Sequence, residues 1–514
     1  MALFSIDMTK NSKDYFLYRF WEIIPGALVW LTFILAIGLS LWQPLWGIYF
    51  ILIFDVYWVL RVTYLLVFLL LSWRKFRQNI KLNWFAKLKT EFGNGDKVWS
   101  DYRHIIFLPM YKEPLSVVED SFQSLIATDY DHQKFLIVLA GEGGAQDHFE
   151  QVSSAIVAKY KQHFFDIVVT IHPKDIEGEL RGKGSNLYWA GNKTKEYVDQ
   201  QGWDYKKIIV SAFDIDTRPH EQYFSYLTYA FLTSPNPYRT SFQPLTLYHN
   251  NIWESDLVTR VVANSTTFWL MTDLARADRL FTFSSHSMSW QALVDVGFWQ
   301  NNIVTEDSRI FLQCLIHYDG DYRVTPMYMT VSMDTVYVGS VWKSLLNQYK
   351  QMRRWAWGVE HYPYMMWHFR ANKKIPRKKA LIYIFNQTEG VYSWATAPIL
   401  IFIMGRLPLY MTDRINENSA LAQAAPLILS NLMTAALAGL VVTAFMSVYI
   451  LPKCPYTGIR KFWAYSMMLV QWIFFPITMI LWGSIPAIDA QTRLMVGAYM
   501  GFWVTEKTRV GKSN

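Results

Sequence analysis

The stretch IIVSAFDIDTRP, residues 208–219, combines a short apolar run with two carboxylates. Residues 208–213 are predicted to form a buried β-strand, because a compact apolar run of this length ends at polar residues. Asp214 and Asp216 follow at its carboxyl end. Residues two apart on an extended chain project to the same side, so both carboxylates could approach one hard cation that also bridges a pyrophosphate. An acidic turn closed by Pro219 explains the same residues without any ligand.

Three other apolar runs have the length and the polar or glycine-containing ends of strands. They are residues 105–108, 135–139 and 167–171. Helical patterns separate them, which predicts a largely parallel α/β sheet that binds ligands at the carboxyl ends of its strands. No apolar stretch between about residues 101 and 337 is long enough to span a membrane. We therefore expect one α/β domain over residues 100–340.

Long apolar runs precede this domain, and the 52% hydrophobic content exceeds that of ordinary soluble proteins. Residues 23–42 carry no charge and are long enough to cross a hydrocarbon layer roughly 30 Å thick. A second run, residues 45–71, contains Asp55 and Arg61. Charges are costly in lipid, so we expect these two side chains to pair with each other or to line a water-filled path. Residues 1–80 are thus predicted to hold two transmembrane helices.

Hydrophobicity returns beyond Leu381. Residues 391–407, 424–451 and 462–485 look like membrane spans, and residues 494–504 are shorter than a normal span. The pattern leaves open whether this last run crosses the membrane or lies at its surface. A C-terminal membrane region over residues 381–514 is therefore predicted to hold three or four transmembrane helices.

The distribution of cations predicts the orientation in the membrane. The cations that flank the apolar runs are Lys10, Lys13, Arg19, Arg74, Lys75, Arg77, Lys81, Lys453, Arg460 and Lys461. Cytoplasmic flanks are enriched in Lys and Arg, so these segments are expected inside the cell, and the loop with Asp413, Arg414 and Glu417 outside. The sequence predicts a multi-pass protein of the cell (inner) membrane with a cytoplasmic α/β domain. Anionic headgroups explain the net charge of +8 better than nucleic acid does.

Residues 302–307, NIVTED, precede the amphipathic run SRIFLQCLIHY. Thr305 followed by two acids is typical of an ordinary helix start, where the hydroxyl caps free N–H groups and Glu306 and Asp307 complement the helix dipole. The same position favours an ionised Asp307, which a general base must be before it accepts a proton. Helix capping and catalysis both explain the motif.

Gln351, Arg354 and Trp355 form a Q-x-x-R-W run, and on a helix all three share one face. Arg354 could hold a phosphate by paired hydrogen bonds while Trp355 stacks on a sugar ring. An interfacial helix explains the run as well, since aromatic residues continue through residue 367 and suit a headgroup belt. Residues 341–380 are expected to form such interfacial helices.

With these motifs in this order between apolar segments, the chain resembles the membrane-embedded family 2 glycosyltransferases, which include cellulose, chitin and hyaluronan synthases. The resemblance covers roughly residues 100–370. In FLPMYKEP it places Pro109, Tyr111 and Glu113 at the donor site, with Lys112 where the family often has asparagine. VLAGEGG offers Glu142 where the family usually has a base-binding aspartate, and RGKGSNLYWA places Lys183 near the nucleotide with Asn186 beside it.

The resemblance also implies roles for the central motifs. Asp214 and Asp216 resemble the nucleotide and metal aspartates, and Asp307, with Glu306 beside it, resembles the catalytic base. Gln351 and Arg354 then belong to donor binding, and Trp355 to acceptor binding. The loop FSSHS, with Ser285 and His286, stands where the family often has a glycine-containing acceptor loop, and Gln243 with Pro244 resembles another recurrent pair.

These observations predict an inverting glycosyltransferase with a GT-A-like (Rossmann-like) cytoplasmic domain inserted between transmembrane helices. We expect a nucleoside diphosphate sugar, first of all a UDP-sugar, as donor, Mg²⁺ or Mn²⁺ as cofactor, and a β-linked polysaccharide as product, translocated across the bilayer as it grows. Asp55 and Arg61 are weak candidates for lining that path. A single addition to a polyprenyl phosphate or lipid is the alternative, and a transporter or scaffold that binds nucleotide without catalysis is a third. The sugar, the linkage and the oligomeric state stay open.

Overall fold

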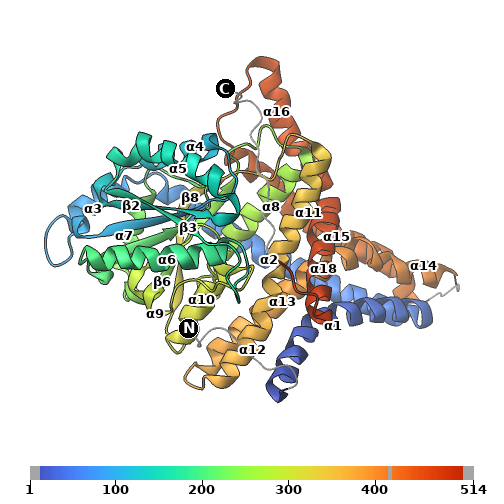
Figure 1. The fold of residues 1–514 in the computed structure, drawn as a ribbon. Coiled ribbons are helices and arrows are strands. Elements are labelled where there is room, and N and C mark those ends of the chain that lie inside the picture. Colours follow the sequence, from blue (N-terminus) through green and yellow to red (C-terminus); the bar gives the residue numbers. More distant parts are fainter. Residues whose placement is uncertain (1–11, 415–418, 502–514) are drawn as a thin grey trace.

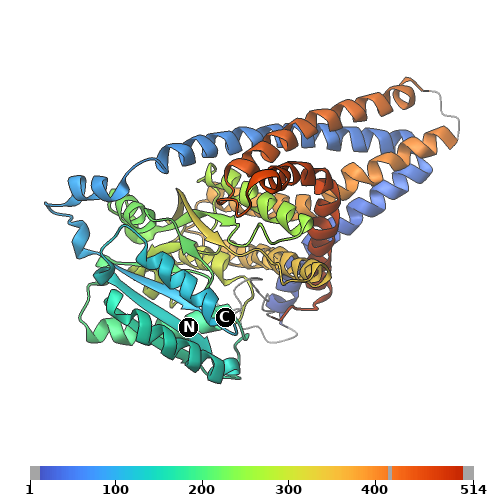
Figure 2. The same cartoon turned by 90° about the horizontal axis from the view of Figure 1, so that it is seen from above.

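A computed structural model describes residues 12–414 and 419–501 of the chain. An α/β domain lies at one side, and an arm of long helices projects from it (Figure 1). The view from above shows that α1 and α2, near the N-terminus, run along the arm beside α15 from the C-terminal region (Figure 2). Segments from both ends of the sequence therefore build the arm together.

The four strands predicted from apolar runs are all present and run parallel to one another. They are β1 (Arg103–Pro109), β2 (Phe135–Glu142), β3 (Asp166–His172) and β4 (Ile208–Ala212). Side chains alternate across β1, so that Ile105 and Phe107 join one apolar core while Ile106 and Leu108 join the other. This half of the sheet is buried on both faces, as its nearly continuous apolar sequence predicts.

The other half of the sheet makes it mixed rather than largely parallel. The described strand order is β3-β2-β1-β4-β7-β6-β8-β5. The added strands are β5 (Arg218–Pro219), β6 (Thr240–Tyr248), β7 (Ser287–Ser289) and β8 (Arg323–Met333). β7 is antiparallel to both β4 and β6, while β6 and β8 are parallel with a register shift between Pro244 and Leu245. The short β7 brings the 282–286 loop to the carboxyl end of β4.

Helices cover both faces of the sheet, with α4 and α5 on one side and α6 on the other (Figure 1). The helices of the α/β domain and its N-terminal link are α3 (Trp84–Phe92), α4 (Leu115–Ile126), α5 (Gln146–Tyr160), α6 (Lys183–Gln200), α7 (Tyr223–Thr233), α8 (Leu257–Leu274), α9 (Trp290–Asp295) and α10 (Glu306–His317). The starts of α6 and α10 lie near the carboxyl end of β4, because Lys183, the first residue of α6, contacts both Asp214 just after β4 and Asp307 in the first turn of α10.

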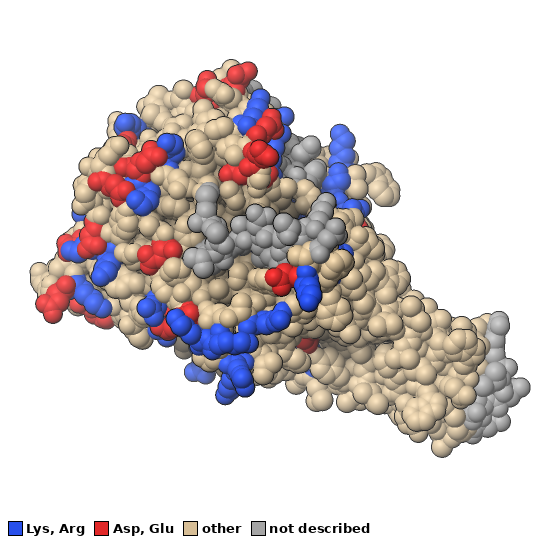
Figure 3. Space-filling view, turned by 60° about the horizontal axis from the view of Figure 1, so that its bottom comes forward, with Lys and Arg blue, Asp and Glu red and all other residues tan. Residues whose placement is uncertain are grey.

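The membrane-type helices agree with the predicted apolar runs. They are α1 (Lys13–Trp42), α2 (Pro44–Asn79), α13 (Arg377–Phe402), α14 (Leu407–Arg414), α15 (Ala420–Tyr449), α16 (Gly458–Val470), α17 (Phe475–Met479) and α18 (Ile485–Val496). Four segments of the described chain are long and apolar enough to cross a membrane, and the bent pair formed by α13 and the helix that follows it would make a fifth. In Figure 3 the arm is covered mainly by uncharged residues, whereas Lys, Arg, Asp and Glu lie on the globular part.

Two sequence expectations about this region are corrected or limited by the structure. Asp55 and Arg61 do not pair with each other, because the Arg61 guanidinium contacts Glu389 on α13. Residues 494–504 do not continue as one helix, since α18 ends at Val496 with Gly497 in a left-handed conformation. Residues 502–504 lie outside the described part, as do Lys10, Glu417 and the side chains of Asp413 and Arg414.

Two shorter helices connect the α/β domain to the arm. α11 (Val341–Ala356) and α12 (His361–Ala371) occupy the segment expected to hold interfacial helices. α11 packs against α18, and Asp489 of α18 accepts hydrogen bonds from Tyr349 (3.1 Å) and Arg353 (2.8 Å). The helix that carries Gln351 and Arg354 is therefore fixed to the C-terminal membrane segment.

Candidate active site

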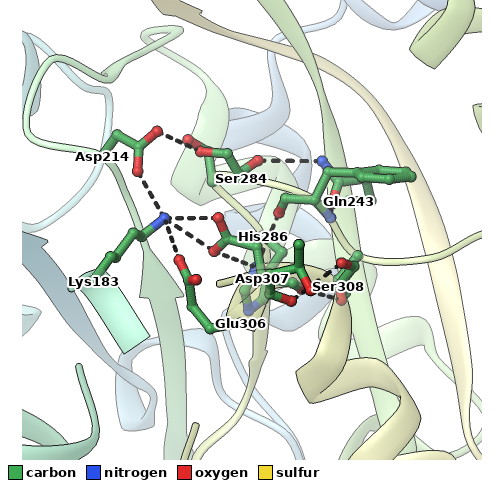
Figure 4. A network of polar contacts seen from close by, with 12 residues as sticks. Lys183, Asp214, Gln243, Ser284, His286, Glu306, Asp307 and Ser308 are labelled. Carbon is green, nitrogen blue, oxygen red and sulfur yellow. Dashed lines mark hydrogen bonds and ion pairs between the residues drawn. The ribbon is translucent and has the colours of Figure 1, made fainter. Parts of the chain in front are cut away.

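Lys183, the first residue of α6, joins carboxylates from two distant parts of the chain (Figure 4). Its Nζ lies 2.7 Å from Asp214 Oδ1, and 3.0 and 2.8 Å from the two oxygens of Asp307. Glu306 Oε1 is 3.8 Å away. Burial alone would lower the pKa of Lys183, but the negative charges of these carboxylates outweigh it and raise the pKa, so the ammonium remains charged.

Glu306 and Asp307 form the first turn of α10, as predicted, but they differ in environment. Glu306 is buried, and burial together with the adjacent charge of Asp307 raises its pKa. A carboxyl group in this state keeps its proton near neutral pH, so Glu306 is poorly suited to act as a base. Asp307 retains 20% exposure and directs both oxygens at Lys183. The Thr305 hydroxyl donates to Glu360 rather than capping the helix, so that part of the capping interpretation is wrong.

Asp214 and Asp216 do not lie on an extended chain, contrary to the sequence argument. They follow β4 in a turn, closed by a hydrogen bond from Thr217 N to Asp214 O (2.9 Å). Asp214 faces Lys183 and also accepts a hydrogen bond from Ser284 Oγ (2.8 Å). Asp216 is fully buried and accepts from the backbone N of Asp334 (2.8 Å). The turn therefore sends the two carboxylates to different partners.

The residues of this turn are better suited to bind a cation that a diphosphate also ligates than a cation that protein side chains bind alone. No group of three or more His, Cys, Asp or Glu side chains with metal-binding geometry occurs among residues 12–414 and 419–501. Mg²⁺ is commonly bound by only one or two carboxylates together with substrate phosphates. Asp214 supplies one such carboxylate at an accessible position, whereas Asp216 is fully buried on the backbone N of Asp334, so the turn fits an ion held by one exposed carboxylate and the diphosphate.

The loop 282–286 lies between these carboxylates and is held from several sides. Thr282 Oγ1 donates to the backbone O of Asp307 (2.6 Å), and Ser284 donates to Asp214. Gln243 on β6 accepts from Phe283 N (2.7 Å). These contacts tie the loop to the carboxyl ends of β4 and β6 and to the start of α10.

Ser285 and His286, predicted to bind the acceptor, are both fully buried within this loop. Ser285 has a positive φ of 66°, a conformation that favours glycine, and its hydroxyl lies 3.0 Å from Thr217 Oγ1. His286 Nδ1 lies 3.0 Å from Phe283 O and 3.8 Å from Asp307 Oδ1. Burial lowers the pKa of His286, so its ring is neutral. The buried ring packs inside the loop and stabilises it. Direct contact of either side chain with an acceptor would require the loop to move.

A surface hollow of about 410 Å³ lies at the carboxyl ends of β2 and β3. Its lining includes Glu142, Gly144, His172, Glu179 and Arg181. His172 bridges two carboxylates, with Nδ1 3.2 Å from Glu142 and Nε2 2.8 Å from Glu179. Burial opposes protonation of His172, but these two hydrogen bonds outweigh it and raise its pKa.

Pro109, Tyr111 and Glu113 lie next to this hollow at the end of β1. Pro109 is the last residue of the strand, and Glu113 accepts from the backbone N of Tyr111 (2.7 Å). Arg181, which lines the hollow, donates to the Tyr111 hydroxyl (2.9 Å). The predicted donor-binding residues of β1 and β2 therefore share one edge of the sheet. Asn186 instead donates to the backbone O of Ala140 (2.9 Å) and is buried, which indicates a structural contact.

The Q-x-x-R-W residues reach the same region from α11. Trp355 packs against Tyr248, with ring centroids 5.8 Å apart. Burial raises the pKa of Tyr248, and so do the negative charges of Asp214, Asp216 and Asp307, while Arg354 lowers it. Gln351 is buried and accepts from Gln348 (3.3 Å), so its amide faces its own helix.

Tyr248, at the end of β6, thus contacts the Q-x-x-R-W helix, and the Lys183 cluster joins the turn after β4 to the start of α10. Tyr248 and Arg181 were not identified as site residues from the sequence. Tyr248 lies at the end of a strand that was not predicted, and Arg181 lies in a loop, so neither stood in a catalytic sequence pattern. The sequence signals were that Tyr248 is near Gln243 and that Arg181 is near Lys183.

Comparison with known proteins agrees with this geometry. Residues 209–490, more than half of the chain, match the glycosyl transferase family group 2. The chain belongs to this family. No curated protein matches it.

Several solved structures are similar to this glycosyltransferase. One is the mannosyltransferase PcManGT from Pyrobaculum calidifontis in complex with GDP-Man and Mn²⁺, with 14% identity, a TM-score of 0.44, and 84% of this chain and 99% of that chain covered. Another is TarS residues 1–349 from S. aureus in complex with UDP-GlcNAc, with 13% identity, a TM-score of 0.32, and 65% and 90% covered.

The family match and the mixed α/β sheet make this a GT-A-like domain of a family 2 glycosyltransferase, flanked by long apolar helices on both sides. This confirms the predicted fold class and enzyme class. The apolar helices support anchoring in a membrane.

Proposed function

We propose that this glycosyltransferase transfers a sugar, with inversion, from a nucleoside diphosphate sugar to a hydroxyl acceptor. The observation that carries the proposal is the gathering of Asp214 and Asp307 around Lys183, beside the contact between Tyr248 and Trp355 of the Q-x-x-R-W helix. The acceptor oxygen forms a bond to the anomeric carbon as the bond from that carbon to the diphosphate oxygen breaks. The acceptor proton passes to Asp307, and the bonding electrons leave with the nucleoside diphosphate.

The donor is expected to occupy the edge formed by the ends of β1, β2 and β4. Glu142 and Tyr111 lie at its nucleoside end, and Arg354 supplies positive charge toward the diphosphate. Asp214 would hold Mg²⁺ or Mn²⁺, which when bound neutralises charge on the leaving diphosphate. Lys183 contacts Asp307 directly. We expect the diphosphate to draw this ammonium away, since Asp307 must be released before it accepts a proton.

The product that we propose is a β-linked polysaccharide, extended at this site and passed between the membrane helices. A hollow of about 280 Å³ behind α11 supports this, because it combines tryptophans with small hydroxyl residues. Trp394, Trp482, Ser265, Thr266 and Met352 are among its lining residues. Because Met352 belongs to α11 and Trp394 and Trp482 to C-terminal helices, the hollow lies between the Q-x-x-R-W helix and those helices.

The Asp307→Asn variant tests the proposed base. We expect transfer to fall by about 10²–10⁴-fold, the usual contribution of a general base, while donor binding persists. Nucleotide release from a panel of nucleotide sugars, with UDP-sugars first, measures transfer, and calorimetry measures binding. Asp321→Asn, at an exposed residue that pairs with Arg239, is the control. Wild-type transfer by Asp307→Asn would refute the assignment.

Product length separates a polymerase from a single-addition enzyme. Wild-type protein incubated with labelled donor is expected to give a ladder of growing products on size chromatography. If one sugar is added and no more, polymerisation is wrong and the lipid acceptor alternative holds. A protein that binds nucleotide without any turnover would instead be a scaffold or transporter.

The proposed location is the inner membrane, with the GT-A-like domain in the cytoplasm. Nucleotide sugars are expected on that side, and the cation-rich helix flanks agree with it.

A further inference from the structure

Two adjacent residues, Glu360 and His361, contact the helix turn that carries Asp307. Glu360 ends the helical turn that follows α11, and His361 is the first residue of α12. The Thr305 hydroxyl donates to Glu360 Oε1, and the Ser308 hydroxyl lies 2.7 Å from His361 Nε2. One segment therefore holds residues on both sides of the proposed base.

Arg309 adds a third contact to the same segment. Its side chain is buried, with Nε donating to His361 Nδ1 (3.2 Å) and Nη2 donating to the backbone O of Glu360 (3.4 Å). The guanidinium carbon also lies 3.7 Å from the ring centroid of Tyr364 on α12. Because His361 Nδ1 accepts a hydrogen bond, the ring proton is on Nε2, which donates to Ser308. Burial and the charge of Arg309 hold the pKa of His361 well below its usual range, so the ring stays neutral.

These contacts lie on the face of α10 opposite the proposed base. Residues three and four apart share one face of a helix, so Thr305, Ser308 and Arg309 form a single stripe. At about 100° per residue, Asp307 leaves the helix on the other side. There its carboxylate points toward Lys183 (Figure 4). The contacts can therefore fix the turn without occupying the site.

Glu360 also ties this turn to the Q-x-x-R-W helix. Its second carboxylate oxygen accepts from Trp357 Nε1 (3.0 Å), and Trp357 directly follows the last residue of α11. Trp357 is three residues beyond Arg354, which is proposed to face the diphosphate. The Thr305 hydroxyl makes its contact with Glu360 in place of an N-cap bond, so the chain gives up a stabilising cap for a connection between two helices.

We propose that Glu360 and His361 are positioning residues, which hold Asp307 in the orientation for proton transfer and fix it relative to the Q-x-x-R-W helix. They act through the first turn of α10 rather than by touching substrate. A base must lie within hydrogen-bond reach of the acceptor hydroxyl, and a misplacement of about 1 Å can cost roughly 10²-fold in rate. This inference rests on the proposed function, to which it adds the residues that orient the base.

Variants that each remove one contact test the proposal. Thr305→Val keeps the shape of the side chain and loses its hydroxyl, Glu360→Leu removes the acceptor, and Ser308→Ala removes the contact with His361. We expect each of them to lower kcat about three- to thirtyfold and to change the donor KM by less than about twofold, because the displaced group acts in the chemical step. Thr305→Ser retains a hydroxyl and should recover most of the loss.

The control variant is Thr194→Val. It removes a buried hydroxyl that donates to the backbone O of Ala190 within α6 (2.7 Å). It should lower the thermal midpoint without the fall in kcat, so loss of stability and loss of positioning are measured separately.

A comparison in the Asp307→Asn background separates positioning of the base from a general structural role. With the carboxylate gone, Glu360→Leu should lower the residual rate by no more than about twofold, because the group that it positions is absent. Long incubation with radiolabelled donor measures that rate. The full loss repeated in this background would show that Glu360 acts independently of Asp307 and would overturn the proposal.

A wild-type kcat in both Thr305→Val and Ser308→Ala would also overturn it. If Glu360→Leu fails to fold, Thr305→Val and Thr305→Ser decide the result, each alone and in the Asp307→Asn background. Wild-type transfer by Asp307→Asn alone would instead refute the proposed base, so failure of the positioning role and failure of the proposed function are distinguishable.

Discussion

At the scale of single residues, Lys183 has the central position in the candidate site. It contacts Asp214 from the turn after β4 and Asp307 from the start of α10, two residues that are distant in sequence. The Lys183 ammonium lies between a donor-binding carboxylate and a catalytic one. Donor binding that changes the partner of one carboxylate would therefore also change the partner of the other. The lysine is therefore expected to link occupancy of the donor site to release of Asp307.

His172 should make the stability of the donor edge depend on pH. Its folded-state pKa is raised by Glu142 and Glu179, so its stabilising effect is fully present below the unfolded value of about 6.5 and is lost as pH rises through the folded value. We expect the thermal midpoint to fall between pH 6 and 8, by roughly 2–4 °C for each kcal/mol lost. His172→Gln should flatten this dependence, whereas His317→Gln, at an exposed histidine, should not. A dependence that persists in His172→Gln would assign the effect to another group.

The sequence predicted individual site residues when they stood in a local pattern. Asp307 and Asp214 were found from the residues around them, and the structure brings both to Lys183. Ser285 and His286 were placed at an acceptor surface, but the loop buries both of them. Burial of a loop depends on Gln243 from β6 and Asp214 from β4, contacts that no local pattern records.

At the scale of elements, α11 depends on α18 for its position. Asp489 binds both Tyr349 and Arg353 of α11, in the turns adjoining Gln351 and Arg354. These groups are partly exposed, and such ion pairs contribute about 0–1 kcal/mol. Their larger effect is expected on geometry at the donor site, because α11 also carries Gln351 and Arg354.

The Asp489→Asn variant measures this dependence. We expect the donor KM to rise about two- to fivefold, equivalent to about 0.5–1 kcal/mol, with a smaller change in the thermal midpoint. Steady-state kinetics and a thermal melt give the two values. Asp199→Asn, which removes an exposed pair with Lys195, is the matched control. An unchanged KM in Asp489→Asn would show that α11 is held in place without this contact.

Strands were predicted where the sequence was a continuous apolar run and missed where it was not. β1 to β4 are such runs. β6 reads TSFQPLTLY and includes Gln243 and Pro244, residues that disfavour a central strand, and β7 is only three residues long. Tertiary pairing with β8 and β4 forms these strands, so local propensity could not reveal them or the antiparallel part of the sheet.

At the scale of the whole molecule, the tip of the arm lies one helix length away from the GT-A-like domain (Figure 2). The turn between α1 and α2 at Gln43, the end of α14 and the start of α15 all lie at that tip. A domain in the cytoplasm would therefore place Gln43 outside. This agrees with the order of apolar and cation-rich segments from which the topology was predicted.

Cysteine labelling tests that topology. In a background with Cys314 and Cys454 replaced, Gln43→Cys should react with a membrane-impermeant maleimide in intact cells. Glu196→Cys, at an exposed residue of α6, should react only after lysis. Both residues are exposed in the described structure. A difference in their labelling by the maleimide would therefore come from the side of the membrane on which each lies. Labelling of Glu196→Cys in intact cells would reverse the orientation.

Between α17 and α18 the chain makes a π-helical turn at Ile480–Ser484, which contains one residue more than an α-helical path would need. Removing one residue there would restore regular winding and rotate everything beyond it by about 100°. Asp489 would then point away from Arg353, and the tryptophan lining contributed by this turn would shift as well. The extra residue of this turn thus determines the direction in which the side chains of α18 point. Insertions or deletions at this position should therefore be far more damaging than substitutions.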